Sequence, residues 1–297
     1  MAQAYTETFP VRYSDCDAYG HVNNAQYLRY MQEAAFGASA SVGYTQKRYQ
    51  ELGQAWLTRS TEIEYLRPLV HGDTIHISTW VGDFRRISSR RYYEIRNAAT
   101  HELAAIANTD WLLIDTQTQR PIAVSDAMIT AYQENTLDGS VTEGERREKF
   151  PEPPAPPEGI FSIERQVEWR DIDTMHHVNN ANYLSFMEEC GVRAAAAFGW
   201  PMQRLAQELK VGLMARKHTI SYNAQAKLGD VLRVSAFLSE VKRSTALRHF
   251  RITHAETGEI ISQSRTLMFC VNIETGMPMR WPQPLIDDMR ANIAQEA

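Results

Sequence analysis

Apolar residues recur with a helical period in two stretches of the chain, residues 23–42 and 179–198. An apolar face with this spacing predicts an amphipathic helix in each stretch. The residues on that face are Tyr27, Met31, Ala34, Ala38 and Val42 in the first helix and Tyr183, Met187, Cys190, Ala194 and Phe198 in the second. Asparagines, which are favoured N-cap residues, open both stretches, and Gly43 or Gly199 follows where a helix commonly ends.

Strand-like segments, separated by turn residues, follow each helix. The predicted strands are 56–66, 74–84, 87–99 and 102–116 in the first half and 212–224, 231–241, 245–254 and 259–273 in the second. One more strand is expected before each helix, and a short helix should close each half. These segments are 7–13 and 163–169 for the strands and 126–133 and 284–294 for the helices. The pattern predicts the α+β class, with an antiparallel sheet wrapped round a central helix in each half.

The two halves are copies of one another. Residues 11–28 and 167–184 are identical at ten of 18 positions, where ordinary composition would give about one. Identical residues recur further along at an offset of 157: Tyr65/Tyr222, Gly72/Gly229, Asp73/Asp230 and Pro121/Pro278. Between the copies, residues 136–159 are rich in charge, glycine and proline and lack apolar periodicity, which is typical of a linker. We therefore expect domains at 1–135 and 160–297.

Composition narrows the class of protein. With 297 residues, 43% hydrophobic and 23% charged, the chain resembles an ordinary globular protein, and its net charge of −5 gives no bulk attraction for nucleic acid. Cys16, Cys190 and Cys270 are too few and too scattered for a disulfide framework or a zinc site. There is no apolar run of membrane-spanning length and no signal segment. We expect a cytoplasmic protein with no metal, no cofactor, and no nucleic-acid or membrane partner.

A string of the form D-x-D-x-x-x-H-V-N-N-x-x-Y occurs at 15–27 and again at 171–183. Together with Glu33, the stretch Tyr65-Leu66-Arg67-Pro68 and Gly72-Asp73, the first copy resembles the 4-hydroxybenzoyl-CoA thioesterase branch of the hotdog superfamily. The second copy also resembles the plant and bacterial acyl-acyl carrier protein thioesterases, which are double hotdogs. The histidine precedes the two asparagines, as in the acyl carrier protein thioesterases, whereas in some relatives it lies within the helix start.

This resemblance implies a hotdog fold in each half and a thioesterase acting in fatty acid metabolism on acyl-CoA or acyl carrier protein. It also implies that the two hotdogs pair side by side into one continuous sheet, with active sites at the seam. The chain would then be an internal pseudodimer, and any further homo-oligomer would be built from such pseudodimers.

Thioester hydrolysis needs an oxygen nucleophile, or a base that makes one from water, and donors for the developing oxyanion. Asp17 and Asp173 precede the helices and are the candidate carboxylates, a role to which the resemblance also points. The backbone N–H groups of 22–24 and 178–180, at the positive ends of the helices, are expected to polarise the carbonyl. The other candidates in the motif are His21, Asn24, His177 and Asn180, with Glu33 and Glu189 as second carboxylates.

Each candidate also has a structural interpretation. The asparagines are good helix caps, Tyr27 and Tyr183 suit the core, and Asp15 and Asp171 suit loop or cap roles. Six basic residues recur at matching positions and would suit CoA phosphates or an acidic carrier protein, or alternatively solvated strand ends: Arg85, Arg86, Arg91, Lys242, Arg243 and Arg248. Four apolar residues would suit an acyl pocket or, alternatively, the core: Trp56, Leu57, Leu213 and Met214.

Two other functions compete with hydrolysis. Hotdog hydratases and dehydratases use a His/Asp pair, but their asparagine-proline signature is absent here; a non-catalytic acyl-CoA sensor ordinarily carries a DNA-binding segment, and none is visible. The chain also lacks the serine-hydrolase and nucleotide-loop motifs. The two sites should differ, because the loop reads Ala18-Tyr19-Gly20 in the first copy and Thr174-Met175-His176 in the second. We expect Asp17 to matter more, since Gly20 permits a positive φ and close approach of substrate.

Overall fold

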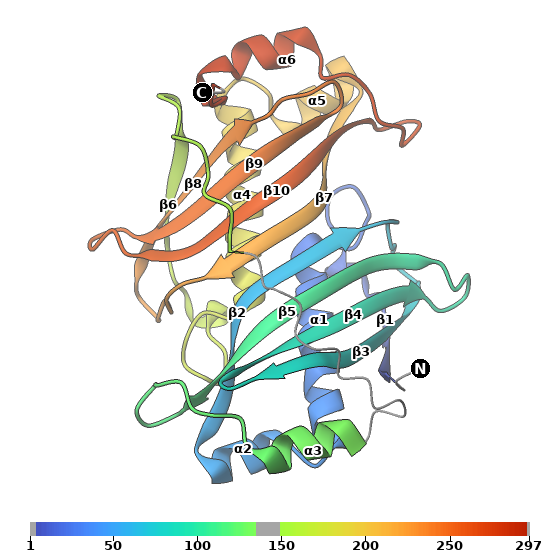
Figure 1. The fold of residues 1–297 in the computed structure, drawn as a ribbon. Helices are drawn as coiled ribbons and strands as arrows, with labels where there is room; N and C mark the ends of the chain where they lie inside the picture. The colour runs from blue at the N-terminus through green and yellow to red at the C-terminus, as the bar shows by residue number, and fades with distance from the viewer. Residues whose placement is uncertain (1–3, 135–148, 296–297) are drawn as a thin grey trace. The chain divides into compact units, whose positions relative to one another are not determined.

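The computed structural model describes residues 4–134 and 149–295, and the chain divides into two compact units, Met1–Lys149 and Phe150–Ala297 (Figure 1). Most of the expected linker, residues 136–148, lies outside the described residues. Its proline-rich end, residues 149–157, forms neither helix nor strand. None of the described helices is long and apolar enough to cross a membrane.

The first unit has one long helix and five strands. In chain order its elements are β1 (Tyr5–Pro10), α1 (Asn24–Ser41), α2 (Gln46–Leu52), β2 (Gln54–Tyr65), β3 (Thr74–Arg85), β4 (Ser88–Asn97), β5 (Leu103–Asp115) and α3 (Asp126–Glu134). The strands lie in the order β1-β3-β4-β5-β2, and every neighbouring pair is antiparallel (Figure 1). The expected α+β class, with a sheet round a central helix, is confirmed.

The second unit repeats this architecture. Its elements are β6 (Phe161–Gln166), α4 (Asn180–Ala197), α5 (Met202–Leu209), β7 (Val211–Tyr222), β8 (Val231–Ser239), β9 (Thr245–His254), β10 (Ile260–Asn272) and α6 (Gln283–Asp288). The strand order β6-β8-β9-β10-β7 is that of the first unit, again antiparallel throughout. The repeat seen in the sequence is therefore a repeat of the whole fold.

One predicted element is wrong in its length. The expected helix over 284–294 ends at Asp288, and a 3₁₀ turn over Arg290–Asn292 follows. The buried amide of Asn292 donates to the carbonyl oxygens of Gly159 and Ala236, at 2.9 and 3.0 Å. The helix therefore ends before Asn292, because the Asn292 amide satisfies two buried carbonyls that a continued helix would leave unpaired.

The central helices begin and end as expected. The Asn23 and Asn179 side chains each accept a hydrogen bond from the backbone N–H two residues on, at 3.0 Å, which satisfies a donor that has no partner within the helix. Gly43 and Gly199 both lie at φ +88°, the left-handed conformation that favours glycine after a helix.

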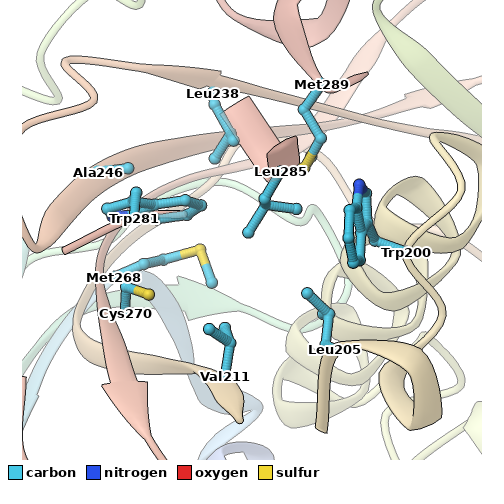
Figure 2. Packing of buried hydrophobic residues seen from close by; sticks show 10 residues of the cluster. All are labelled: Trp200, Leu205, Val211, Leu238, Ala246, Met268, Cys270, Trp281, Leu285 and Met289. Atoms are coloured by element: carbon cyan, nitrogen blue, oxygen red, sulfur yellow. The ribbon is translucent and has the colours of Figure 1, made fainter. Parts of the chain in front are cut away.

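A cluster of large apolar side chains closes one end of the second unit (Figure 2). Leu285 and Met289, from α6 and the residue after it, pack with Trp200 and with Leu205 of α5. Leu238 of β8 belongs to the same cluster and is fully buried. The terminal segment therefore covers apolar surface that the sheet would otherwise expose to water.

Candidate active site

The motif forms the same loop in both units. In the first, the Asp17 N–H donates to the His21 carbonyl at 2.7 Å; in the second, the Asp173 N–H donates to the His177 carbonyl at 3.0 Å. The chain thus turns back on itself directly before the central helix. The residue before each histidine has a left-handed backbone, with φ +80° at Gly20.

A buried aspartate stabilises each loop by accepting hydrogen bonds from neighbouring groups. Asp15 Oδ2 accepts the Arg12 N–H at 2.8 Å and the Tyr30 hydroxyl at 2.7 Å. Asp171 Oδ2 accepts the Glu168 N–H at 2.9 Å, and the Arg165 guanidinium donates to both of its oxygens at 3.0 Å. Because these groups occupy the carboxylates, the geometry supports the structural interpretation of Asp15 and Asp171.

The candidate catalytic aspartates also take part in the turn. Asp17 Oδ1 accepts the N–H groups of Tyr19 and His21 at 2.8 and 3.2 Å. Asp173 Oδ1 accepts the Met175 N–H at 2.8 Å. One carboxylate oxygen therefore organises the loop in each copy, so an Asp→Asn change can keep the turn while removing the charge.

In the second unit the aspartate and the histidine lie together. His177 Nδ1 lies 3.6 Å from Asp173 Oδ2 and 3.3 Å from the Val178 carbonyl oxygen. The His177 side chain is nearly buried, and its Nε2 makes no hydrogen bond with any of the described residues. Two oxygen neighbours favour the proton on Nδ1, which leaves the lone pair on the buried Nε2. In the described part of the first unit, the half-buried His21 forms no such pair with Asp17.

The backbone donors differ from the expectation. The Val22 and Asn23 N–H groups donate to the carbonyls of Leu69 and Asp15, at 2.8 and 2.9 Å. In the second unit the equivalent groups of Val178 and Asn179 donate to the carbonyls of Ala226 and Asp171, both at 2.9 Å. These four N–H groups are therefore not available to a substrate carbonyl, because carbonyl oxygens of loops and 3₁₀ turns already accept them. The expected role of the Asn24 and Asn180 N–H groups, at the first residues of α1 and α4, stays a prediction.

The structure does not bring the second carboxylates to the loops of their own units. Glu33 and Glu189 are exposed, and Glu189 forms an ion pair with Arg193 at 2.6 Å. Each lies nine residues into its helix, which is about 14 Å along the axis from the first helical residue. Their participation in catalysis stays a prediction.

Burial divides the six basic residues into two sets. Four are exposed at the end of β3 or in the β3–β4 and β8–β9 connections: Arg85, Arg86, Lys242 and Arg243. Arg91 and Arg248 are only 6% and 5% exposed and lie within β4 and β9. The six therefore do not form one solvent-facing cluster, and a phosphate-binding role of the exposed four stays a prediction.

The apolar candidates pack partly as core. Trp56 lies against the cluster of Leu113, Val124 and Met128, and its indole N–H donates to the Tyr49 hydroxyl at 2.9 Å. Leu213 packs against the cluster of Figure 2. The geometry favours the core interpretation for these two residues, while Leu57 and Met214 are half-buried.

Sequence reasoning did not single out His218 and Thr266, which form a row of buried polar residues with Arg248 across the second sheet. His218 of β7 shares a hydrogen bond with Thr266 of β10 at 2.8 Å, and Thr266 lies opposite Arg248 in the β9–β10 ladder. All three are almost fully buried. The signal was present in the chain, because Arg91 and Thr109 occupy the same positions 157 residues earlier, and Arg91 lies opposite Thr109 in the first sheet.

Comparison with known proteins agrees with this architecture. The curated relatives include oleoyl-acyl carrier protein thioesterase 1 of Arabidopsis thaliana, which is 25% identical over 242 residues, 77% of this chain and 62% of the relative. The chain thus spans about three fifths of the length of that plant protein. The acyl-CoA thioesterase YbgC of Haemophilus influenzae is 28% identical over 123 residues, which cover 41% of this chain and 89% of the relative.

Solved structures show the same fold. The structure of the 12:0-ACP thioesterase from Umbellularia californica matches with a TM-score of 0.71 and 18% identity, covering 91% of this chain and 98% of the other. At the level of sequence families, residues 11–132 and 167–293 each match the family described as the thioesterase-like superfamily. These two matches take in most of the chain and nearly all of both repeats. The chain belongs to the thioesterase-like superfamily and carries two copies of its hotdog domain in tandem.

Proposed function

We propose that this chain hydrolyses acyl thioesters of coenzyme A or acyl carrier protein to a free acid and a thiol. The observation that carries the proposal is the pairing of Asp173 with His177 in a loop directly before α4, on a backbone that both repeats share. Relatives named as acyl-acyl carrier protein and acyl-CoA thioesterases support the same chemistry. Because the chain spans only part of the plant relatives, the choice of thiol carrier is part of the proposal.

In the proposed mechanism His177 Nε2 takes a proton from water, and the water oxygen attacks the thioester carbonyl carbon. Asp173, whose Oδ2 lies 3.6 Å from Nδ1, stabilises the imidazolium that forms. The tetrahedral intermediate then breaks its C–S bond, and the thiolate takes the proton from Nε2. The positive end of the α4 dipole stabilises the oxyanion.

The two copies should differ in the direction opposite to the sequence-based expectation. That expectation depended on Gly20, but His176 adopts the same left-handed backbone, with φ +62°, and its side chain is exposed. The loop conformation therefore does not separate the copies. What separates them is the nearly buried pair of Asp173 and His177, and we propose that the second site is the more active.

We also propose that the two units pair edge to edge as an internal pseudodimer, as the family resemblance implies. Larger homo-oligomers, a cytoplasmic location and a role in fatty acid metabolism stay predictions.

A thiol-release assay over acyl-CoA and acyl carrier protein substrates of increasing chain length tests the function. One of the substrates is a 2-enoyl-CoA, whose conjugated double bond absorbs. Thiol release without loss of this enoyl absorbance supports hydrolysis, whereas loss of the absorbance without thiol release would indicate a hydratase. Binding without turnover would indicate an acyl-CoA-binding protein. The double variant Asp17→Asn with Asp173→Asn should abolish turnover and retain the fold. Glu256→Gln, an exposed carboxylate outside both loops, is the matched control and should keep full activity.

A further inference from the structure

Arg248 carries a buried positive charge that no described residue of its own unit neutralises. It lies in β9 between Leu238 of β8 and Thr266 of β10, and its side chain reaches the underside of α4. Its Nη2 atom is buried and makes no hydrogen bond with residues 4–134 or 149–295. Burial lowers the pKa of Arg248 to about 10, so the guanidinium remains charged at neutral pH.

The nearest ionisable group does not supply the missing charge. Cys190 lies on α4 beside Arg248, but burial raises the pKa of its thiol to about 12. The thiol is therefore neutral and donates to the Val234 carbonyl at 3.3 Å. Within the described residues Arg248 forms no ion pair with a carboxylate.

Arg91, the equivalent arginine of the first unit, contacts a hydroxyl and an aromatic ring. Arg91 Nη1 donates to the Thr79 hydroxyl at 3.4 Å, and the guanidinium carbon lies 5.8 Å from the centre of the Tyr132 ring. At the offset of 157 these two positions become Ala236 and Met289, which offer neither a hydroxyl nor an aromatic ring. The second repeat has the arginine but not these two partner groups.

A glycine of α4, Gly191, leaves room for the Arg248 guanidinium. A Cβ added at Gly191 would lie 2.7 Å from Arg248 Nη1 and 3.3 Å from the Phe250 ring. Glycine within a helix costs about 1 kcal/mol relative to alanine, so its place here is explained by the room it leaves for the guanidinium. An uncompensated buried charge is strongly unfavourable, so a ligand that brings the opposite charge would stabilise Arg248.

We propose that the interior of the second unit, between α4 and strands β8 to β10, binds a monocarboxylate with an apolar body, with Arg248 as its counter-ion and Thr266 as a neighbouring hydroxyl. One negative charge balances one guanidinium, whereas a phosphate dianion would leave a second charge buried without a partner. Phe250 and Leu238, which lie beside Arg248, suit an apolar body. The inference goes beyond the proposed hydrolysis and does not depend on it.

Isothermal titration of the whole chain with octanoate tests the proposal, with octanol and octyl phosphate as matched probes. The protein carries Asp17→Asn and Asp173→Asn, so that hydrolysis and its loss play no part in the result. We expect octanoate to bind, and Arg248→Met to weaken it about tenfold or more, because a charge-assisted hydrogen bond is lost. Arg91→Met, the same change in the first repeat, should leave the affinity unchanged. Octanol should bind equally weakly with and without Arg248, and octyl phosphate should bind less tightly than octanoate.

Two further measurements distinguish loss of the binding site from loss of the fold. Ala236→Thr gives Arg248 the hydroxyl partner that Arg91 has in Thr79 and keeps the positive charge. Because this hydroxyl competes with the carboxylate for the guanidinium, the variant should weaken octanoate binding. Without ligand, Arg248→Met should keep or raise the melting temperature, whereas Arg91→Met should lower it. Octanoate that binds Arg248→Met as tightly as its parent, or an Arg248→Met protein that melts lower than Arg91→Met, would overturn the proposal.

Discussion

His218 offers a direct test of how burial in the second unit controls stability. Its side chain is 2% exposed, and burial lowers the pKa of its imidazole to about 3. In the unfolded chain the same imidazole has an ordinary pKa of about 6.5. Between these values the unfolded chain binds a proton and the folded protein does not, so the free energy of unfolding falls as the pH falls from about 6.5 towards 3.

The size of the effect follows from the shift. Each pH unit in this window costs about 1.4 kcal/mol, so lowering the pH from 7.5 to 5.0 should remove about 2 kcal/mol through His218. Thr61 stands at the equivalent position of the first repeat, where its hydroxyl lies 3.5 Å from that of Thr109. His218→Thr is therefore the matched variant, because the same fold already accepts threonine there.

Urea denaturation followed by circular dichroism at pH 7.5 and 5.0 measures the difference. The parent protein should lose about 2 kcal/mol more than His218→Thr over this change of pH. Packing costs of the substitution are present at both pH values and cancel. Burial also lowers the pKa of His249 to about 4, but this contribution is equal in both proteins. Equal losses in the parent and in His218→Thr would show that His218 is not held neutral by the fold.

Three other predictions concern the motif loops. Asp173→Asn and His177→Gln should each lower kcat by roughly 100-fold or more, and Asp17→Asn by less, measured as thiol release under saturating substrate; equal effects of the two aspartate variants would contradict the proposed difference between the sites. If His177 activates water, a single turnover in ¹⁸O-water should label the product acid and leave Asp173 unlabelled, whereas direct attack by Asp173 would form a mixed anhydride whose hydrolysis at the Asp173 carbonyl places the label on Asp173. His176→Gly should raise the free energy of unfolding by about 0.5–1 kcal/mol, because glycine adopts the left-handed backbone without strain; a decrease in a urea titration would refute this.

The sequence alone determined the elements and the repeat. Helix and strand positions follow from local periodicity, and the caps at Asn23 and Asn179 follow from residue types adjacent to the backbone groups they satisfy. The duplication was visible because both copies keep the same loop and the same spacing. The loop roles of Asp15 and Asp171 were also within reach, since their partners include backbone N–H groups only three residues away.

Only the tertiary structure decided what depends on residues distant in the chain. Leu69 and Ala226 take the N–H groups of Val22 and Val178, and no local pattern indicates that these acceptors arrive there. Burial of Arg248 depends on which face of β9 meets α4. An arginine within a strand is equally compatible with either face, and only packing decides whether its charge meets water or the interior of the protein.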